Sequence, residues 1–125
     1  MTDKITVLIA DDHPLFRKGM RALLESLPEM SIAGEAASGR EAVDMALQLE
    51  PDVTLMDLQM PDGGGLAAIH QLVRLRPEGG ILVVTLFEDD ESVFTAIRAG
   101  ARGYVLKDAS EQEIVRAIKA VAQGE

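Results

Sequence analysis

The sequence of 125 residues contains no cysteine and no tryptophan, and its aromatic residues are one tyrosine and three phenylalanines. The absence of cysteine excludes a disulfide framework, a thiol nucleophile and a thiolate metal site. Because aromatic side chains are so scarce, the hydrophobic core must be largely aliphatic. The length is that of one ordinary domain, so we expect residues 1–125 to form a single domain with one core.

Positive charge is also in short supply. Lysine and arginine number 12 against 21 aspartates and glutamates, which gives a formal net charge of -9 and a sequence pI near 4.6. Such a surface repels phosphate backbones and anionic lipid headgroups. We therefore expect no direct nucleic-acid contact by this domain and no membrane binding. If DNA is involved, another domain must contact it.

Long hydrophobic runs are missing as well. The first apolar run, residues 5–10, is followed by two aspartates before it reaches the length of a signal-peptide core or a transmembrane span. We therefore expect a cytoplasmic protein.

Short apolar runs alternate with helical patterns five times along the chain. The expected strands are residues 5–10, 31–37, 52–57, 80–85 and 103–106. The first, third and fourth runs are almost continuously apolar, which is typical of strands covered on both faces. The alternation predicts an α/β fold, (βα)5, with a doubly wound, mainly parallel sheet and helices on both faces.

The helices are predicted from apolar residues at helical spacing and from their end signals. Serine and glutamate three residues apart predict capping boxes at Ser38 with Glu41 and at Ser110 with Glu113. Gly100 is predicted to end the fourth helix. The apolar stripes expected to be buried are Phe16, Met20, Leu23, Leu24 and Leu27; Ala42, Val43, Ala46 and Leu47; Leu66, Ile69, Leu72 and Val73; Val93, Phe94 and Ile97; and Ile114, Ala117, Ile118 and Val121.

Polar residues stand at the ends of four of the predicted strands. Asp11 and Asp12 follow the first strand, and Asp57 ends the third. Thr85 ends the fourth strand, and Lys107 follows the fifth. In an open parallel sheet, ligands bind outside the carboxyl ends of the strands, where the strand order reverses. We therefore expect these five side chains to converge on one edge of the sheet.

Three carboxylates at one edge would repel one another, by roughly a few kcal/mol per pair at the effective dielectric of a protein surface. A hard divalent cation relieves this repulsion, and Mg²⁺ binds through one or two carboxylates while it keeps several waters. We expect Mg²⁺ to be bound by Asp57, by the backbone carbonyl of Gln59, and by either or both of two aspartates, Asp11 and Asp12. The competing interpretation, a helix N-cap ahead of Pro14, explains one of these two aspartates but not both.

A cation and a hydroxyl complete the predicted site. Lys107 and Thr85 can each bind an anionic oxygen opposite the metal, and together they outline a phosphoryl group. An aspartate can attack phosphorus to form an acyl phosphate while fixed charges neutralise the transferred oxygens, and Asp57 is the candidate nucleophile. Taken singly, Thr85 fits an ordinary strand residue and Lys107 an ordinary surface lysine. His13 is interpreted as a helix-start residue at the rim, without a chemical role.

Four segments together resemble the receiver domain of two-component response regulators, most closely the NarL/FixJ group with a LuxR-type output domain. They are VLIADDHPLFRKGM, DVTLMDLQMPDGGGL, VVTLFEDDE and IRAGARGYVLKDASEQEIVRAIKAV. The resemblance implies that Asp57 is the phosphoacceptor, with Asp11 and Asp12 as the acids that hold Mg²⁺. It also implies that Thr85 and Lys107 contact the phosphoryl group.

The resemblance further implies a switch and a set of partners. Phosphorylation is implied to draw Thr85 toward the phosphoryl group and to let Tyr104 rotate. The implied fold is flavodoxin-like, with strand order 2-1-3-4-5. A sensor histidine kinase would phosphorylate the domain, which would then form a homodimer or act on a C-terminal helix-turn-helix DNA-binding domain. That output domain is absent from these 125 residues and is expected in the full-length protein. The receiver would catalyse only its own phosphoryl transfer and dephosphorylation.

Two positions depart from the commonest family pattern. Leu86 follows Thr85 where receivers often have a small residue, which predicts narrower access to Asp57 for water and small phosphodonors. Asp108 follows Lys107 where many receivers have proline, so we expect a trans peptide bond there.

Two other classes of function stay open. One is an aspartyl phosphotransferase or phosphatase that acts on outside substrates. Gln59 counts against it, because enzymes of the haloacid-dehalogenase kind usually carry a second aspartate two residues after the nucleophile, at this position. The other is a phosphorylation-independent, receiver-like interaction module.

Overall fold

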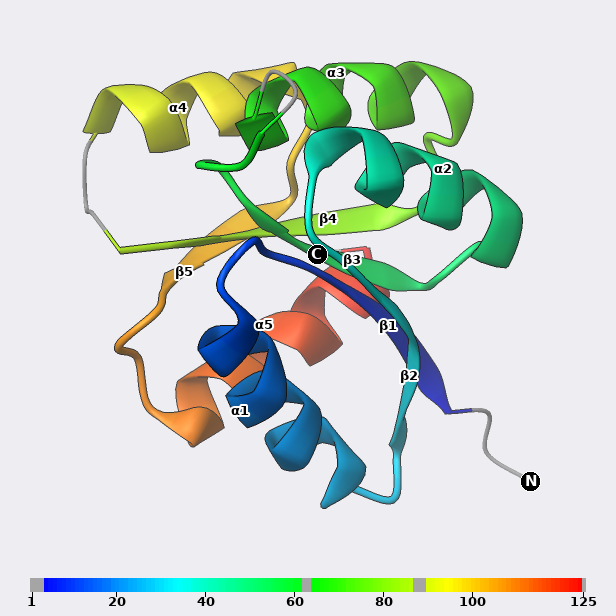
Figure 1. The fold of residues 1–125 in the computed structure, drawn as a ribbon, viewed down its shortest axis with the longest axis vertical. Coiled ribbons are helices and arrows are strands. Elements are labelled where there is room, and N and C mark those ends of the chain that lie inside the picture. Colours follow the sequence, from blue (N-terminus) through cyan, green and yellow to red (C-terminus); the bar gives the residue numbers. More distant parts are fainter. Residues whose placement is uncertain (1–3, 62–63, 87–89, 125) are drawn as a thin grey trace.

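The computed structural model describes residues 4–61, 64–86 and 90–124 and contains five strands in one sheet. The strand order is β2-β1-β3-β4-β5, and helices lie on both faces of the sheet (Figure 1). All neighbouring strands pair in parallel. The doubly wound, flavodoxin-like fold and its strand order are therefore confirmed.

The helices and strands follow the predicted alternation. The strands are β1 (Ile5–Ala10), β2 (Met30–Ala36), β3 (Val53–Asp57), β4 (Gly80–Thr85) and β5 (Gly103–Leu106). The helices are α1 (Pro14–Glu25), α2 (Gly39–Leu49), α3 (Gly64–Leu75), α4 (Asp90–Ala99) and α5 (Glu111–Ala122). Three strands have the predicted bounds, whereas β2 lies one residue earlier and β3 begins one residue later. In the described part of the chain, no helix is long and apolar enough to span a lipid bilayer.

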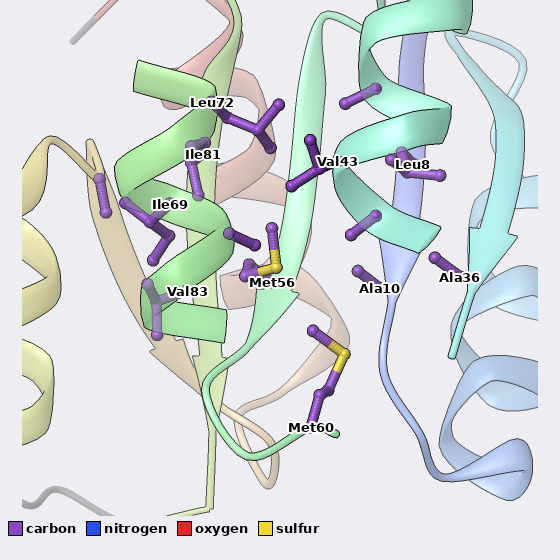
Figure 2. Packing of buried hydrophobic residues seen from close by; sticks show 14 of the residues in the cluster. Leu8, Ala10, Ala36, Val43, Met56, Met60, Ile69, Leu72, Ile81 and Val83 are labelled. Atoms are coloured by element: carbon purple, nitrogen blue, oxygen red, sulfur yellow. The ribbon is translucent and has the colours of Figure 1, made fainter. Parts of the chain in front are cut away.

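The sheet divides the core into two aliphatic layers. Val7 and Ile9 of β1 pack toward α1 and α5 on one face. Leu8 and Ala10 pack toward α2, α3 and α4 on the other face, and Figure 2 shows this second layer. Side chains of a strand alternate between its two faces, which produces this division. Because both faces are covered, β3 is buried at every position, and this explains its nearly continuous apolar sequence.

Three apolar residues that the helical spacing predicts to be buried are exposed. They are Leu47 on α2, and Phe94 and Ile97 on α4, of which Phe94 is 59 % exposed. Among the α4 side chains whose burial the structure describes, the buried ones are Val93, as predicted, and Ala96. Ala96 belongs to the layer formed with α2 and α3, and so small a residue lets the helix approach closely while its larger neighbours stay outside. The spacing predicted the helix correctly but not which stripe is buried.

The helix ends agree with the predicted capping in part. At α5 the box is complete, because Ser110 accepts the backbone N–H of Glu113 at 3.1 Å and the Glu113 carboxylate accepts the Ser110 backbone N–H. At α2, Ser38 accepts the backbone N–H of Glu41 at 3.2 Å. The Glu41 carboxylate, however, accepts the N–H of Ala37 rather than that of Ser38. The predicted capping box at α2 is therefore only half correct.

Two glycines permit backbone arrangements that other residues would not. Gly100 follows α4 with a φ of 123°, a region that favours glycine, and it ends the helix as predicted. Gly65 lies in the first turn of α3, where an added Cβ would overlap the backbone oxygen of Asp57. The start of α3 thus lies directly against the end of β3 and fixes the backbone of Asp57.

The pairing of β1 with β2 contains one irregularity. The register shifts between Val7 and Leu8 of β1. Their partners in β2 are Ile32 and Gly34. Ala33 is therefore an extra residue, a β-bulge, and such a bulge changes which face of the sheet the following side chains occupy.

Candidate functional site

The carboxyl edge of the sheet gathers the polar residues that the sequence places at the strand ends. Asp11 directly follows β1 and is 1 % exposed, and Asp57 ends β3 and is 4 % exposed. Thr85 ends β4 and is also buried. Lys107 directly follows β5 with its side chain 7 % exposed, whereas Asp12 lies nearer the rim. The parallel sheet therefore brings all five predicted residues to one edge.

Lys107 is held between two carboxylates and an aromatic ring. Its Nζ lies 2.7 Å from Asp11 Oδ2 and 3.5 Å from Asp57 Oδ2. The same ammonium lies 4.7 Å from the centre of the Phe16 ring, within reach of a cation–π interaction. The backbone N–H of Lys107 donates to the carbonyl of Thr85 at 2.7 Å, which joins the residue after β5 to the end of β4. The neighbouring acids compensate the charge of this buried lysine.

Asp57 is a buried carboxylate in an electronegative setting. Its Oδ1 accepts the backbone N–H of Gln59 at 3.1 Å, and its Oδ2 faces Lys107. Burial first, and the negative charge of Asp11 after it, raises the pKa of Asp57 above its ordinary value. The Gln59 hydrogen bond and the Lys107 charge oppose this shift without cancelling it. The site therefore holds more negative charge than its single buried lysine neutralises.

The turn after β1 is fixed by polar contacts on both sides. Asp11 Oδ1 accepts the backbone N–H of His13 at 2.8 Å. Arg17 donates to the backbone oxygen of Asp11 at 2.6 Å and, through Nε, to Glu35 at 3.2 Å. The hydrogen bond from Arg21 is the main reason that the pKa of Glu35 lies below its ordinary value. This network ties α1 and β2 to the backbone of the acidic turn.

The acidic residues at this edge fit a divalent cation. Ligand atoms of Asp11, Asp12, His13 and Asp57 all lie within 4.8 Å of one another. Asp11 Oδ2, although buried, lies 2.7 Å from the Lys107 ammonium, whereas the buried Asp12 Oδ1 accepts no hydrogen bond from any residue the structure describes. Buried carboxylate oxygens at a site rich in negative charge suit a hard cation such as Mg²⁺.

His13 belongs to the cluster, which the sequence did not predict. It is the N-cap residue of α1, so the predicted helix-start position is correct and neither aspartate is the N-cap. Its ring Nδ1, however, lies 2.9 Å from Asp11 Oδ1 and 3.3 Å from Asp12 Oδ1. The available signal was a histidine directly after two acids and directly before Pro14, because a residue before proline is restricted to extended backbone.

The edge continues toward α4 in a pocket of about 280 Å³. Its lining residues are Leu58, Gln59, Leu66, Thr85, Glu91, Ser92 and Thr95. Leu86 is exposed next to it, and Tyr104 on β5 is 49 % exposed. No peptide bond between described residues is cis, which confirms the trans bond predicted before Asp108. The roles of Thr85, Leu86 and Tyr104 in phosphate binding, access and switching stay predictions.

Similarity to known proteins shows the family of the chain. The family description that matches residues 7–119 is the response regulator receiver domain. The uncharacterized transcriptional regulatory protein YxjL and the transcriptional regulatory protein LiaR, both of Bacillus subtilis, are each 44 % identical, over 123 and 121 residues. These alignments cover 98 % and 97 % of this chain, and 56 % and 57 % of those proteins.

A solved structure supports the same conclusion. The receiver domain of the putative response regulator NarL from Mycobacterium tuberculosis has a TM-score of 0.94 and 32 % identity, and the match covers 98 % of this chain and 99 % of that chain. The chain belongs to the response-regulator receiver family, and its relatives include NarL-type regulators. The chain spans about half the length of the curated relatives it matches. The resemblance inferred from the sequence is confirmed.

Proposed function

We propose that this receiver domain is a phosphorylation switch in which Asp57 accepts a phosphoryl group from a sensor histidine kinase. The observation that carries the proposal is the position of Asp57, a buried carboxylate at the end of a central strand, beside Asp11 and 3.5 Å from the Lys107 ammonium. A purely structural buried carboxylate is expected to have a full set of donors. In the described part of the chain, Asp57 accepts one backbone N–H and faces this one ammonium, and the His13 ring lies 3.9 Å away.

The proposed ligands of Mg²⁺ are Asp11, Asp12, Asp57 and the backbone carbonyl of Gln59. Asp12 contributes a buried oxygen that receives no hydrogen bond from the described residues, and Asp11 contributes a buried carboxylate whose Oδ2 already lies 2.7 Å from one cation, the Lys107 ammonium. Gln59 lies in the loop directly after Asp57, and its N–H already binds that carboxylate. When bound, Mg²⁺ supplies the positive charge that balances the phosphoryl oxygens.

In the proposed transfer, one Asp57 oxygen attacks the phosphorus of the kinase phosphohistidine. The new O–P bond forms as the P–N bond breaks, and the electron pair of the P–N bond leaves with the imidazole. Lys107 binds one phosphoryl oxygen, which requires only a small movement because its Nζ already lies beside Asp57 Oδ2. The Thr85 hydroxyl binds another. Catalysis here rests on positioning and charge compensation.

Thr85 and Tyr104 are the proposed switch residues. When Thr85 moves toward the phosphoryl group, it vacates space into which the half-exposed Tyr104 turns. This movement reshapes the surface formed by α4, β5 and α5. Phosphorylation thereby biases a two-state element and favours a homodimer of the phosphorylated domain.

The proposed regulated partner is an attached C-terminal helix-turn-helix domain. YxjL and LiaR are named as transcriptional regulatory proteins, and this chain covers little more than half of each. Because a net charge of -9 repels DNA, the attached domain would make the DNA contact. Transcription is regulated at the chromosome, so we place the protein in the cytoplasm, without a membrane partner. The receiver acts as a signalling domain that catalyses only its own phosphoryl transfer and dephosphorylation.

Intact-mass measurement after incubation with acetyl phosphate, with and without Mg²⁺, tests this function. We expect the wild type to gain one phosphoryl group only with Mg²⁺, and Asp57→Asn to gain none. Asp44→Asn, which removes an exposed carboxylate of α2, is the matched control and should gain it like the wild type. Label on Asp57→Asn would contradict the assignment of the acceptor.

A histidine kinase provides the second donor. Leu86 predicts restricted access for small donors, so a wild type without label from acetyl phosphate is tested again with a phosphorylated sensor histidine kinase. Failure with both donors would contradict the proposal. It would favour a phosphorylation-independent, receiver-like interaction module.

A further inference from the structure

The Lys107 ammonium lies against an aromatic ring as well as against polar groups. Its Nζ lies 2.7 Å from Asp11 Oδ2, 3.2 Å from His13 Nδ1 and 3.5 Å from Asp57 Oδ2. The same Nζ lies over the Phe16 ring, 4.7 Å from the ring centre. Because the lysine side chain is only 7 % exposed, little water remains to solvate its charge. A cation–π contact stabilises a desolvated ammonium more strongly than an exposed one.

The fold brings the ring and the ammonium together from two distant parts of the chain. Phe16 lies in the first turn of α1 and packs, partly buried, against the core layer beside α1 and α5. Leu15, one residue earlier, is 83 % exposed. Lys107 lies in the loop between β5 and α5, and both helices lie on the same face of the sheet (Figure 1). The position of the ring is therefore set by the packing of α1.

The ring attracts the ammonium over a wider range of positions than a carboxylate does. A charged hydrogen bond between an ammonium and a carboxylate oxygen needs a separation of about 2.7–2.9 Å. The face of a ring attracts a cation anywhere within about 6 Å of its centre. At 4.7 Å, the Lys107 ammonium can therefore move by about 1 Å and keep this contact.

The proposed phosphoryl transfer requires a movement of this size. Lys107 must turn from Asp11 toward an oxygen on Asp57, and its present distance from Asp57 Oδ2 exceeds that of a charged hydrogen bond by less than about 1 Å. The carboxylate partner of the ammonium changes during this movement. The contact with Phe16 persists, so the ammonium is not left without a partner in a buried place.

We propose that Phe16 is a positioning residue for phosphoryl transfer, whose ring holds the Lys107 ammonium within reach of Asp57. The inference rests on the proposed function, in which Lys107 binds a phosphoryl oxygen. An aliphatic side chain could fill the same place in the core layer, but it would not attract the ammonium. The ring therefore supports the transfer through its attraction for charge as well as through packing.

Fluorinated phenylalanines at position 16 separate attraction for charge from packing. Fluorine withdraws electron density from the face of the ring and weakens its attraction for a cation, while the shape of the ring changes little. We expect the labelling rate of Asp57, at saturating Mg²⁺, to fall stepwise from difluoro- to trifluoro- to pentafluorophenylalanine, by about five- to thirtyfold in total. A rate that stays constant along the series would overturn the proposal.

Phe94 provides the matched control for the fluorinated series. Its ring lies 5.6 Å from the guanidinium carbon of Arg98, so it also makes a cation–π contact, but on the exposed side of α4. The same substitutions at Phe94 should leave the labelling rate at the wild-type value. Acetyl phosphate is the first donor, because it requires no docking surface on α1. An equal loss of rate at both positions would overturn the proposal.

Urea denaturation without Mg²⁺ measures the contact independently of phosphorylation. In a double-mutant cycle of Phe16→Leu and Lys107→Met, the loss of packing is shared by both backgrounds and cancels. We expect Phe16→Leu to lower the folding equilibrium constant by a further factor of about five to thirty when Lys107 is present. Phe16→Tyr, which keeps a ring, should retain this coupling. Equal effects of Phe16→Leu in both backgrounds would overturn the proposal.

The two measurements separate this inference from the proposed function. A wild type that takes no label from acetyl phosphate or from a phosphorylated histidine kinase would refute the proposed function, and the unfolding cycle would still decide whether the ring holds the ammonium. If only the kinase labels the wild type, the fluorinated series is measured at saturating kinase. Coupling in the cycle together with an unchanged labelling rate would show that the ring stabilises Lys107 without serving the transfer, and it would overturn the positioning role.

Discussion

The Lys107 ammonium lies closer to Asp11 Oδ2, at 2.7 Å, than to Asp57 Oδ2, at 3.5 Å. Lys107 and a divalent cation would therefore compete for the same carboxylate, that of Asp11. We expect Lys107→Met to bind Mg²⁺ about three- to tenfold more tightly than the wild type, because a competing positive charge has been removed. Isothermal calorimetry measures the affinity.

The matched control for this prediction is Lys119→Met. Lys119 lies on α5 and pairs with Glu29 at 3.0 Å, so the substitution changes the net charge equally. We expect its Mg²⁺ affinity to stay at the wild-type value. Weaker Mg²⁺ binding by Lys107→Met would show that the lysine supports the metal rather than competing with it.

The raised pKa of Asp57 predicts that its charge destabilises the metal-free fold. Because the folded pKa lies above the ordinary value of 3.8, the folded state binds more protons between the two values. The free energy of unfolding therefore falls as the pH rises from about 3.8 through the folded pKa. In EDTA at pH 7, we expect Asp57→Asn to raise the free energy of unfolding by about 1–3 kcal/mol.

Urea denaturation at several pH values checks this expectation. The advantage of Asp57→Asn should shrink as the pH falls toward 3.8, the ordinary value for aspartate, since the wild-type carboxyl is then neutral as well. Asp44→Asn, an exposed substitution, should show little effect at any pH. A variant less stable than the wild type at pH 7 would contradict the prediction.

Arg17 is expected to position the acidic turn through its hydrogen bond to the Asp11 backbone oxygen. Arg17→Met keeps much of the aliphatic stem but removes the donors. We expect it to lower the free energy of unfolding by about 1–3 kcal/mol and to weaken Mg²⁺ binding, because the turn loses its anchor. Arg21→Met is the matched control, since Arg21 binds Glu35 but is not seen to contact Asp11. Equal loss of Mg²⁺ affinity in both variants would contradict this prediction and would show that Arg17 contributes only to the stability of the fold.

Gly65 is expected to tolerate no side chain. An added Cβ would overlap the backbone oxygen of Asp57, and a backbone atom cannot rotate away. We expect Gly65→Ala to lower the free energy of unfolding by about 1–3 kcal/mol and to slow labelling of Asp57. Gly19→Ala is the contrasting control, because its Cβ would meet nothing within 4 Å and should stabilise α1 by about 0.5–1 kcal/mol. Similar unfolding curves for the two variants would contradict the prediction.

The sequence was sufficient for the fold because short apolar runs, typical of strands, alternate clearly with segments that have apolar residues at helical spacing. Short apolar runs predicted every strand to within one residue, and the serine and glutamate spacing located the start of α5. The exposure of Phe94 and Ile97 could not be predicted, because apolar spacing shows that a helix has an apolar face but not how closely it packs. The small Ala96 decides that distance, and its effect depends on neighbours distant in sequence.

The sequence predicted where the site lies but not all of the residues that form it. Strand ends placed Asp11, Asp57 and Lys107 together, since parallel strands bring their carboxyl ends to one edge. His13 was missed because its ring direction depends on the turn that Asp11 makes with its own backbone. The contact of Arg17 with Glu35 joins α1 to β2. It depends on how these elements pack, so no local sequence pattern predicts it.

The β-bulge at Ala33 determines where Glu35 lies. With this extra residue, Glu35 pairs with Ile9, whose side chain belongs to the layer beside α1, where the two arginines bind the carboxylate. Without it, Glu35 would pair with Ala10 and enter the apolar layer under α2 and α3. Removal of Ala33 would retain every charge, but each later side chain of β2 would move to the opposite face of the sheet. This strand should therefore accept many substitutions but very few changes of length.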